Sequence, residues 1–170
     1  MSYTISGLPL EIFTPLFGLR DEELALRGIS RTIVDAKPSF PCRITLAEAE
    51  LGERVYLLNF EHQPARTPYR SSHAIFVREA ASHTATYVDR IPESLRMRLL
   101  SIRAFDAEGT MIDAEVIDGV HLEPLIERLF ADPAAAYLHV HNAKRGCYAA
   151  RVDRSSLAAL VCRNERRAVG

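Results

Sequence analysis

Alternating apolar and polar positions predict two β-hairpins in the second half of the chain. Residues 99–105 and 111–117 alternate on either side of the turn Asp106-Ala107-Glu108-Gly109. Residues 137–141 and 147–152 form a second alternating pair, joined by a short polar segment. Successive side chains of a strand point to opposite faces, and a short polar stretch containing glycine favours chain reversal. Both pairs are therefore expected to form antiparallel ladders.

Further strands are expected upstream of these hairpins. Residues 54–62 and 73–78 are rich in β-branched, aromatic and other apolar residues, and a loop with two prolines separates them. Apolar side chains occupy both faces of the first of these strands, which predicts a place in the middle of a sheet. Shorter extended segments are expected at residues 3–7 and 29–36.

Three helices are predicted, and the clearest covers residues 122–131. Its apolar positions follow the i, i+3, i+4, i+7, i+8 stripe of a core-facing helix, namely Leu122, Leu125, Ile126, Leu129 and Phe130. A short helix is expected over residues 22–27, with Asp21 as its N-cap and Gly28 at its end. A final short helix is expected to begin at Ser155 or Ser156.

The order of these elements predicts an α+β fold. Strands come as neighbouring hairpins without βαβ alternation, which favours a mainly antiparallel, twisted sheet with two to four short helices. The length of 170 residues fits one domain over residues 1–170, and such a domain buries roughly 70% of the surface of its unfolded chain. Residues 163–170 are expected to fray as a tail.

Composition narrows the class of protein further. A net charge of −1 argues against a nucleic-acid partner, since such proteins carry an excess of Lys and Arg. Apolar runs stay shorter than the roughly 20 residues of a membrane span, and the N-terminus does not resemble a signal peptide. The three cysteines are odd in number and have no CxxC spacing, as expected of free thiols. These features together predict a cytoplasmic protein.

The most informative candidate site is the pair His139 and His141. Residues i and i+2 of a strand share a face, so the two imidazoles would project side by side, with Cα atoms roughly 6.5–7 Å apart. Such a pair suits one metal ion, zinc above all, or one anionic ligand. A metal would need a further ligand, for which the candidates are His62, His73, Cys42 and Cys147. The neighbours Leu138 and Val140 would take the core face, which turns the histidines toward a pocket floor or toward solvent.

A second candidate is the loop 63–72, which His62 and His73 flank. If the two strands pair, these histidines meet at one end of the sheet. The loop carries hydroxyl and guanidinium groups that suit a carboxylate or a phosphate, from Arg66, Tyr69, Arg70, Ser71 and Ser72. The alternative is an ordinary surface loop whose histidines satisfy local backbone groups.

Two weaker candidates involve a cysteine and a turn. Cys42 follows Pro41 and precedes Arg43, and a neighbouring cation favours the reactive thiolate; the alternative is a small buried apolar residue. The turn around Asn142, Lys144 and Arg145 offers backbone N–H groups and positive charge to a phosphate; the alternative is a solvated hairpin tip.

Several phrases of the sequence resemble a known family. They are Phe40-Pro41-Cys42-Arg43, Asn59-Phe60-Glu61-His62-Gln63-Pro64, Thr67-Pro68-Tyr69-Arg70-Ser71-Ser72-His73-Ala74-Ile75-Phe76-Val77 and Leu138-His139-Val140-His141-Asn142-Ala143-Lys144. Over about residues 5–154 the chain is similar to the bacterial family catalogued as domain of unknown function 1203. The resemblance implies a small bacterial protein and carries over no activity, substrate or catalytic residue.

Three functions are consistent with these residues. The first is a protein that binds a small anionic molecule and hydrolyses it or transfers a group, since no dinucleotide-binding fingerprint is present. Its catalytic candidates are His62, His73, His139, His141 and Cys42, and its ligand-binding candidates are Arg43, Tyr69, Arg70, Ser71, Asn142 and Lys144. The second is a zinc protein that uses His139 and His141. The third is an interaction module without chemistry that forms a homodimer.

Overall fold

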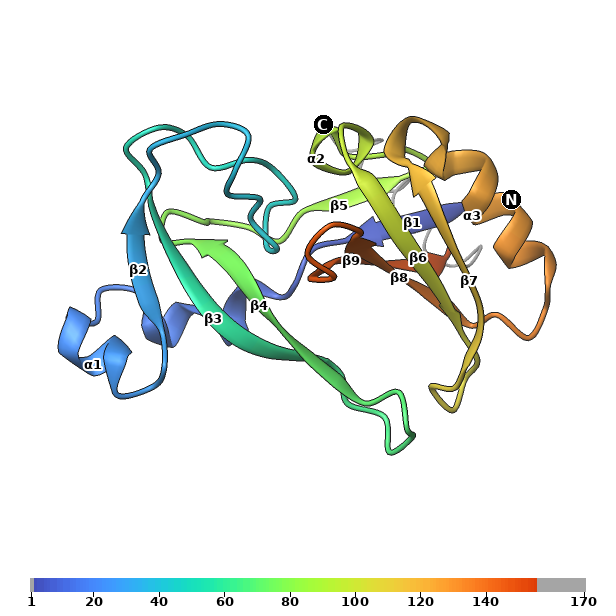
Figure 1. Cartoon of the computed structure of the whole chain (residues 1–170), viewed down its shortest axis with the longest axis horizontal. Coiled ribbons are helices and arrows are strands. Elements are labelled where there is room, and N and C mark those ends of the chain that lie inside the picture. Colours follow the sequence, from blue (N-terminus) through green and yellow to red (C-terminus); the bar gives the residue numbers. More distant parts are fainter. Residues whose placement is uncertain (1, 156–170) are drawn as a thin grey trace, which may run out of the picture.

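The chain folds into two antiparallel sheets that stand side by side (Figure 1). A computed structural model describes residues 2–155. One sheet has six strands in the order β5-β1-β9-β8-β6-β7, and the other has three in the order β2-β3-β4. Short helices accompany these two sheets, and the predicted α+β class is therefore confirmed.

The six-stranded sheet contains both predicted hairpins. In the first, β6 (Leu99–Phe105) pairs with β7 (Met111–Asp118); in the second, β8 (Tyr137–Asn142) pairs with β9 (Tyr148–Arg154). Each pairing is antiparallel, and β6 also pairs with β8, so the two hairpins form one continuous surface. The N-terminal strand β1 (Tyr3–Ser6) pairs with β9 on one side and with β5 (Thr86–Val88) on the other. Strand β5, which was not predicted, is the edge strand on that side of the sheet.

In the three-stranded sheet, β3 (Arg54–Gln63) lies between β2 (Ser30–Ile33) and β4 (Ser71–Arg78). The central place predicted for the segment 54–62 is therefore confirmed. Strand β2 is shorter than the extended segment expected over residues 29–36. Within the described residues, this sheet leaves both β2 and β4 as edge strands.

The predicted helix 122–131 is confirmed as α3 (Leu122–Ala131), and all five residues of its apolar stripe are buried. The N-cap prediction was wrong, because α1 (Asp21–Ala25) begins at Asp21 and its N-cap is Arg20. The backbone N–H of Arg20 donates to the Glu23 carboxylate at 2.9 Å. This contact between the N-cap residue and the first turn is one half of a capping box, and it does not involve Asp21.

The remaining helical segments are short. Helix α2 (Glu93–Arg96) was not predicted, and three single 3-10 turns occur at η1 (Leu10–Ile12), η2 (Thr14–Leu16) and η3 (Gly119–His121). The helix expected from Ser155 or Ser156 and the tail 163–170 lie outside the described residues. None of the helices described is long and apolar enough to cross a membrane.

Three apolar clusters are found among the described residues, and the smallest contains Val34, Ala49 and Val55 beside the three-stranded sheet; the two larger ones position the site. One lies between the six-stranded sheet and α3, where Leu138 and Val140 of β8 pack with the stripe of the helix. The other joins the sheets, since Ile75 and Val77 of β4 cluster with Tyr148 of β9. Because Leu138 and Val140 face α3, the alternate residues of β8 face the three-stranded sheet.

Polar contacts also tie the sheets together at the end of β3. The buried amide Nε2 of Gln63 donates to the hydroxyl of Tyr137 at 2.7 Å. Beyond β3, the Thr67 hydroxyl donates to the carbonyl of Gly109, in the β6–β7 turn, at 3.1 Å. The loop 63–72 is therefore docked on the neighbouring sheet.

Candidate functional site

Four histidines from the two sheets meet in the space between them. His62 lies near the end of β3 and His73 lies in β4, whereas His139 and His141 come from β8. His139 and His141 are almost completely buried, with 1% and 0% of their surface exposed, and His62 is 8% exposed. The predicted alternatives for this face of β8 were a pocket floor or solvent. The histidines do not face solvent, because both are buried, and neither of them is among the residues that line the pocket described below.

The rings of these histidines touch one another. The centroid of His62 lies 4.8 Å from that of His73, 5.1 Å from that of His141 and 5.4 Å from that of His139. On its other side, the ring of Tyr148 stacks on His62 at 4.7 Å. The cluster is a packed group of rings that the two sheets hold together from opposite sides.

The β3–β4 and β8–β9 pairings each have a register shift next to a histidine of the cluster. The β3–β4 register shifts between Glu61 and Gln63, at the position of His62. The β8–β9 register shifts between Val140 and His141. A β-bulge bends a strand and re-aims the side chains beside it. His62 and Gln63, which are neighbours at this irregularity, are both buried.

Several ring nitrogens of the cluster have no hydrogen-bond partner among the described residues. The Nδ1 of His141 lies 2.9 Å from the carbonyl oxygen of Gly146, and because that oxygen only accepts, Nδ1 must donate. The Nε2 of His141 therefore presents a lone pair, and it is buried without a partner. The Nδ1 atoms of His62 and His139 are also buried and unpaired.

Burial keeps these imidazoles neutral. It lowers the pKa of His139 to about 2, that of His141 to about 3 and that of His62 to about 4. The pKa of His73 is also lowered, by burial first and then by the positive charge of Arg103. A neutral imidazole with a free lone pair is the form that coordinates a metal ion.

Three of the four histidines are grouped closely enough that they could hold a metal ion. His62, His73 and His141 each offer one ring nitrogen, and these three atoms lie within 4.8 Å of one another. Zinc binds imidazole at roughly 2.0–2.1 Å, so two ligands of one ion are at most about 4.2 Å apart, and a pair at the observed limit would close by about 0.6 Å. We call these three residues the histidine centre. Of the expected pair, it includes His141 and leaves His139 outside.

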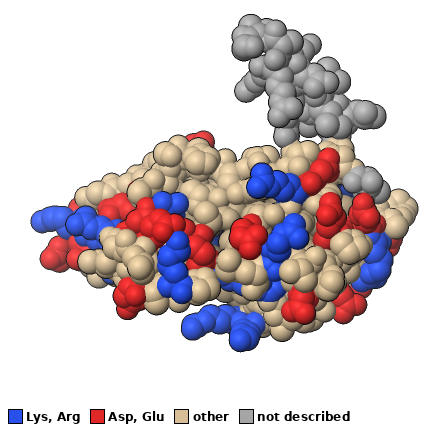
Figure 2. Space-filling model, turned by 90° about the horizontal axis from the view of Figure 1, so that it is seen from above, with Lys and Arg blue, Asp and Glu red and all other residues tan. Residues whose placement is uncertain are grey.

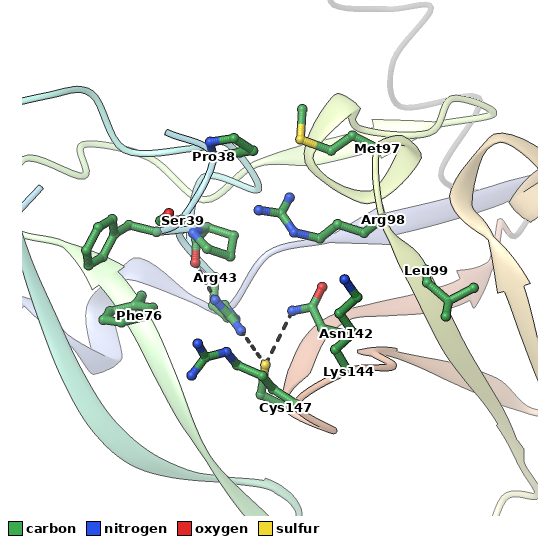
Figure 3. A pocket seen from close by; sticks show the side chains of 13 residues that line it. Pro38, Ser39, Arg43, Phe76, Met97, Arg98, Leu99, Asn142, Lys144 and Cys147 are labelled. Carbon is green, nitrogen blue, oxygen red and sulfur yellow. Dashed lines mark hydrogen bonds between the residues drawn. The ribbon is translucent and has the colours of Figure 1, made fainter. Parts of the chain in front are cut away.

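A separate pocket of about 540 Å³ opens beside the cluster (Figure 3). Four of its lining side chains are basic, and none of the described residues that line it is acidic. The other lining residues are mostly apolar. The basic residues are Arg43, Arg98, Lys144 and Arg145, and we call this cavity the basic pocket.

Three of the predicted ligand-binding residues meet in the basic pocket. They are Arg43, from the segment before β3, and Asn142 and Lys144, from the end of β8 and the turn that follows it. Arg43 is 2% exposed; its Nε donates to the carbonyl of Tyr148 at 2.8 Å, and its Nη2 lies 3.1 Å from the sulfur of Cys147. Burial lowers the pKa of the Arg43 guanidinium.

The other predicted residues lie elsewhere. Arg70 is exposed and pairs with Glu61 at 2.5 Å, and the exposed Tyr69 contacts the ring of Phe105. The hydroxyl of Ser71 lies 3.4 Å from Nε2 of His62, at the border of the histidine centre. Cys42 is buried in the apolar cluster between the sheets, where its sulfur accepts the backbone N–H of Arg78 at 3.3 Å.

The sequence-based selection missed two residues that shape these sites. Tyr148 stacks on His62 and pairs with His141 across the hairpin, so the predicted ladder held a signal for it. Arg98 enters the pocket just before β6, and its guanidinium pairs with Glu48 from a distant loop. No local pattern around Arg98 predicts that contact.

On the face of the molecule that Figure 2 shows, the charged side chains do not gather into a further site. Basic and acidic side chains are interspersed on the face that Figure 2 shows. A mixture of signs agrees with the net charge of −1 and contrasts with the pocket, where all the charged residues of the lining are basic.

Comparisons with known proteins place the chain in a family. No curated protein and no solved structure matches it. The family described as "Protein of unknown function (DUF1203)" matches residues 39–154, which include strands β3 to β9, all four clustered histidines and the basic side chains of the pocket. Because the match covers more than half of the chain, this protein belongs to the DUF1203 family.

Proposed function

We propose that this protein binds a small anionic molecule in the basic pocket. The observation that carries the proposal is the lining: four basic side chains and no described acidic one around a cavity of about 540 Å³. That volume lies within the roughly 300–1,000 Å³ of ordinary ligand sites. A cavity lined by one sign of charge concentrates ligands of the opposite sign.

The four basic residues differ in what they have left to offer a ligand. Arg98 forms an ion pair with Glu48. Arg43 donates hydrogen bonds to two backbone carbonyls and to the sulfur of Cys147. Lys144 and Arg145 are exposed and make no ion pair with a described residue. Their side chains are the ones available to a carboxylate or phosphate, and an arginine can hold either through two parallel hydrogen bonds.

The apolar residues that line the pocket could contact the apolar part of a ligand. Phe40 and Phe76 line the pocket, and their rings meet edge to face at 5.0 Å. Pro38, Pro41 and Met97 add further apolar surface to the lining, and Leu99 adds apolar surface on the side of Lys144 (Figure 3). The ligand supported best is therefore an amphipathic anion, with an apolar body and one carboxylate or phosphate.

Phenyl phosphate is a simple probe of this chemistry. Its titration should raise the melting temperature, because a ligand that binds only the folded state adds about 2.7 kcal/mol at a concentration 100-fold above Kd. The double variant Lys144→Ala/Arg145→Ala should lose this shift. A matched control is Arg27→Ala/Arg66→Ala, which removes two exposed charges away from the pocket. An equal shift in both double variants would contradict the proposal, as would no shift in the parent protein.

A second candidate function is zinc binding by the histidine centre. It is supported by the three ring nitrogens within 4.8 Å and by the buried, unpaired Nε2 of His141. The bond from His141 to the carbonyl of Gly146 resembles the outer contacts that orient metal-binding histidines. Three protein ligands leave a fourth position open, as in catalytic zinc sites.

Elemental analysis tests this candidate. After dialysis with zinc, we expect one ion per chain in the parent protein and substoichiometric zinc in His141→Gln and His73→Gln. His83→Gln is the matched control, since His83 is exposed and outside the centre. His139→Gln should retain zinc, which separates this centre from the His139/His141 pair. Equal zinc content in His83→Gln and His141→Gln would rule the candidate out.

A further inference from the structure

Cys147 stands where the basic pocket meets a buried cation. Its sulfur lies 3.1 Å from Nη2 of Arg43 and 3.3 Å from Nδ2 of Asn142, as the dashed lines of Figure 3 show. Both nitrogens are donors, so the sulfur is the acceptor of two N–H groups. Cys147 is half-buried and lines the cavity, which makes its sulfur accessible from the pocket.

The charge of Arg43 has no carboxylate partner among the described residues. Its other N–H groups donate to the backbone carbonyls of Tyr148 and Pro41. A buried, unpaired charge costs several kcal/mol, and a nearby anion offsets that cost. The ionisable group that contacts this guanidinium is Cys147, whose sulfur favours the charged form of Arg43 against the effect of burial.

Cys42 differs from Cys147 in both exposure and neighbouring charge. Its side chain is 1% exposed and packs in the apolar cluster between the sheets. The donor to its sulfur is a backbone N–H, and Cys42 is not among the lining residues of the pocket. Thiol reactivity depends on access and on positive charge nearby, and Cys147 has both.

We propose that Cys147 is a reactive thiol that exchanges with small anionic disulfides held in the basic pocket. This rests on the proposed anion binding, because Lys144 and Arg145 would hold the anionic groups. The thiol proton leaves to solvent, and the Cys147 thiolate attacks one sulfur of the bound disulfide. A new S–S bond forms, the old S–S bond breaks, and the departing thiolate takes its electron pair. Cys147 is oxidised to a mixed disulfide, and the other half of the reagent is reduced.

Two disulfide reagents test the proposal in a Cys162→Ser background, where Cys42 and Cys147 are the remaining thiols. The probes are dithiobis(nitrobenzoate), which is anionic, and dithiodipyridine, which is neutral. We expect one thiol per folded chain to react and mass spectrometry to place the adduct on Cys147. For each reagent, the rate of reaction with Cys147 is divided by its rate with free cysteine. This relative rate should be roughly tenfold or more higher for the anionic reagent than for the neutral one. Asn142→Ala should slow both reagents roughly three- to tenfold, because one donor to the sulfur is lost.

The outcomes separate this inference from the anion proposal. If Cys147 reacts rapidly but equally with both reagents, the reactive thiol stands and the anionic preference fails. If Cys162→Ser/Cys147→Ser reacts as fast as Cys162→Ser, or if thiols react only after unfolding, the inference fails, and phenyl phosphate binding still tests the pocket independently. Lys144→Ala/Arg145→Ala should abolish the preference for the anionic reagent without abolishing reaction of the thiol.

Discussion

The Nε2 atom of His62 lies 2.7 Å from the Nδ1 atom of His73, so one ring donates to the other across the β3–β4 ladder. The two rings are also nearly parallel, with centroids 4.8 Å apart. Protonation of both rings would set two N–H donors against each other and place two positive charges in a buried space. The pair is therefore stable in its neutral form.

This relationship predicts how stability depends on pH. Histidines of the unfolded chain protonate near pH 6.5, whereas burial lowers the folded pKa of His62 to about 4 and that of His141 to about 3. Between these values the unfolded state binds more protons, so the free energy of unfolding decreases as the pH falls. Well below pH 6.5, each such histidine contributes a slope of about 1.4 kcal/mol per pH unit. Urea unfolding of chelator-treated protein at pH 7, 6 and 5 measures it.

Histidines and carboxylates affect the free energy of unfolding in different pH ranges. The pKa of Glu23 is lowered by the hydrogen bond from the Arg20 backbone, so its contribution is present above pH 4.5 and is lost below it. A decline between pH 6.5 and 5 therefore belongs to the histidines. The exposed His83 serves as the control, since His83→Ala should leave the slope unchanged. A flat unfolding free energy from pH 7 to 5 would show that the imidazoles are not buried as described.

A second prediction concerns the bond between Gln63 and Tyr137. Tyr137→Phe removes the hydroxyl that accepts from the buried Gln63 amide and should cost about 1–3 kcal/mol, because the amide is left unsatisfied. The double variant Gln63→Leu/Tyr137→Phe should cost less than the sum of the single changes, since no orphaned donor remains. Tyr69→Phe, at an exposed ring, is the control. Additive costs in urea unfolding would argue against a direct bond between the sheets.

The elements that the sequence predicted well are those whose signal is local. The stripe from Leu122 to Phe130 predicts α3 because 3.6-residue periodicity leaves one face apolar, and the structure buries that face. The β6–β7 hairpin follows from alternation around a turn that ends in Gly109, whose φ is +85°. Short elements such as β5 and α2 carry too few residues for a periodic pattern to emerge.

The site itself depended on information that is not local. Sequence proximity grouped Arg70 with His62 and His73, yet Arg70 pairs with Glu61 on the surface. Arg43 reaches Cys147, more than 100 residues later, because the two sheets pack side by side. The register shift at His62 also has no sequence signature. Sheet packing and bulges arise from long-range contacts, which strand periodicity does not encode.

The close contact at Gly7 gives a final prediction. A Cβ atom at this position would lie 2.0 Å from the carbonyl oxygen of Ile44, a separation that no packed pair tolerates. The next residue, Leu8, donates its backbone N–H to the carbonyl of Arg43 at 2.7 Å, so the chain after β1 supports the segment that carries Arg43. Gly7→Ala should therefore push this segment away and destabilise the protein by roughly 3 kcal/mol or more.

The control for this change is Gly28→Ala. Gly28 has a φ of +68° and open space around its Cβ position, so alanine there pays only for the left-handed backbone, about 1–2 kcal/mol. The two variants differ in kind as well as in size. Gly7→Ala should also weaken phenyl phosphate binding, because displacement of Arg43 deforms the pocket, whereas Gly28→Ala should bind as the parent does. Equal unfolding free energies and equal affinities for the two variants would mean that Gly7 does not hold Arg43 in place.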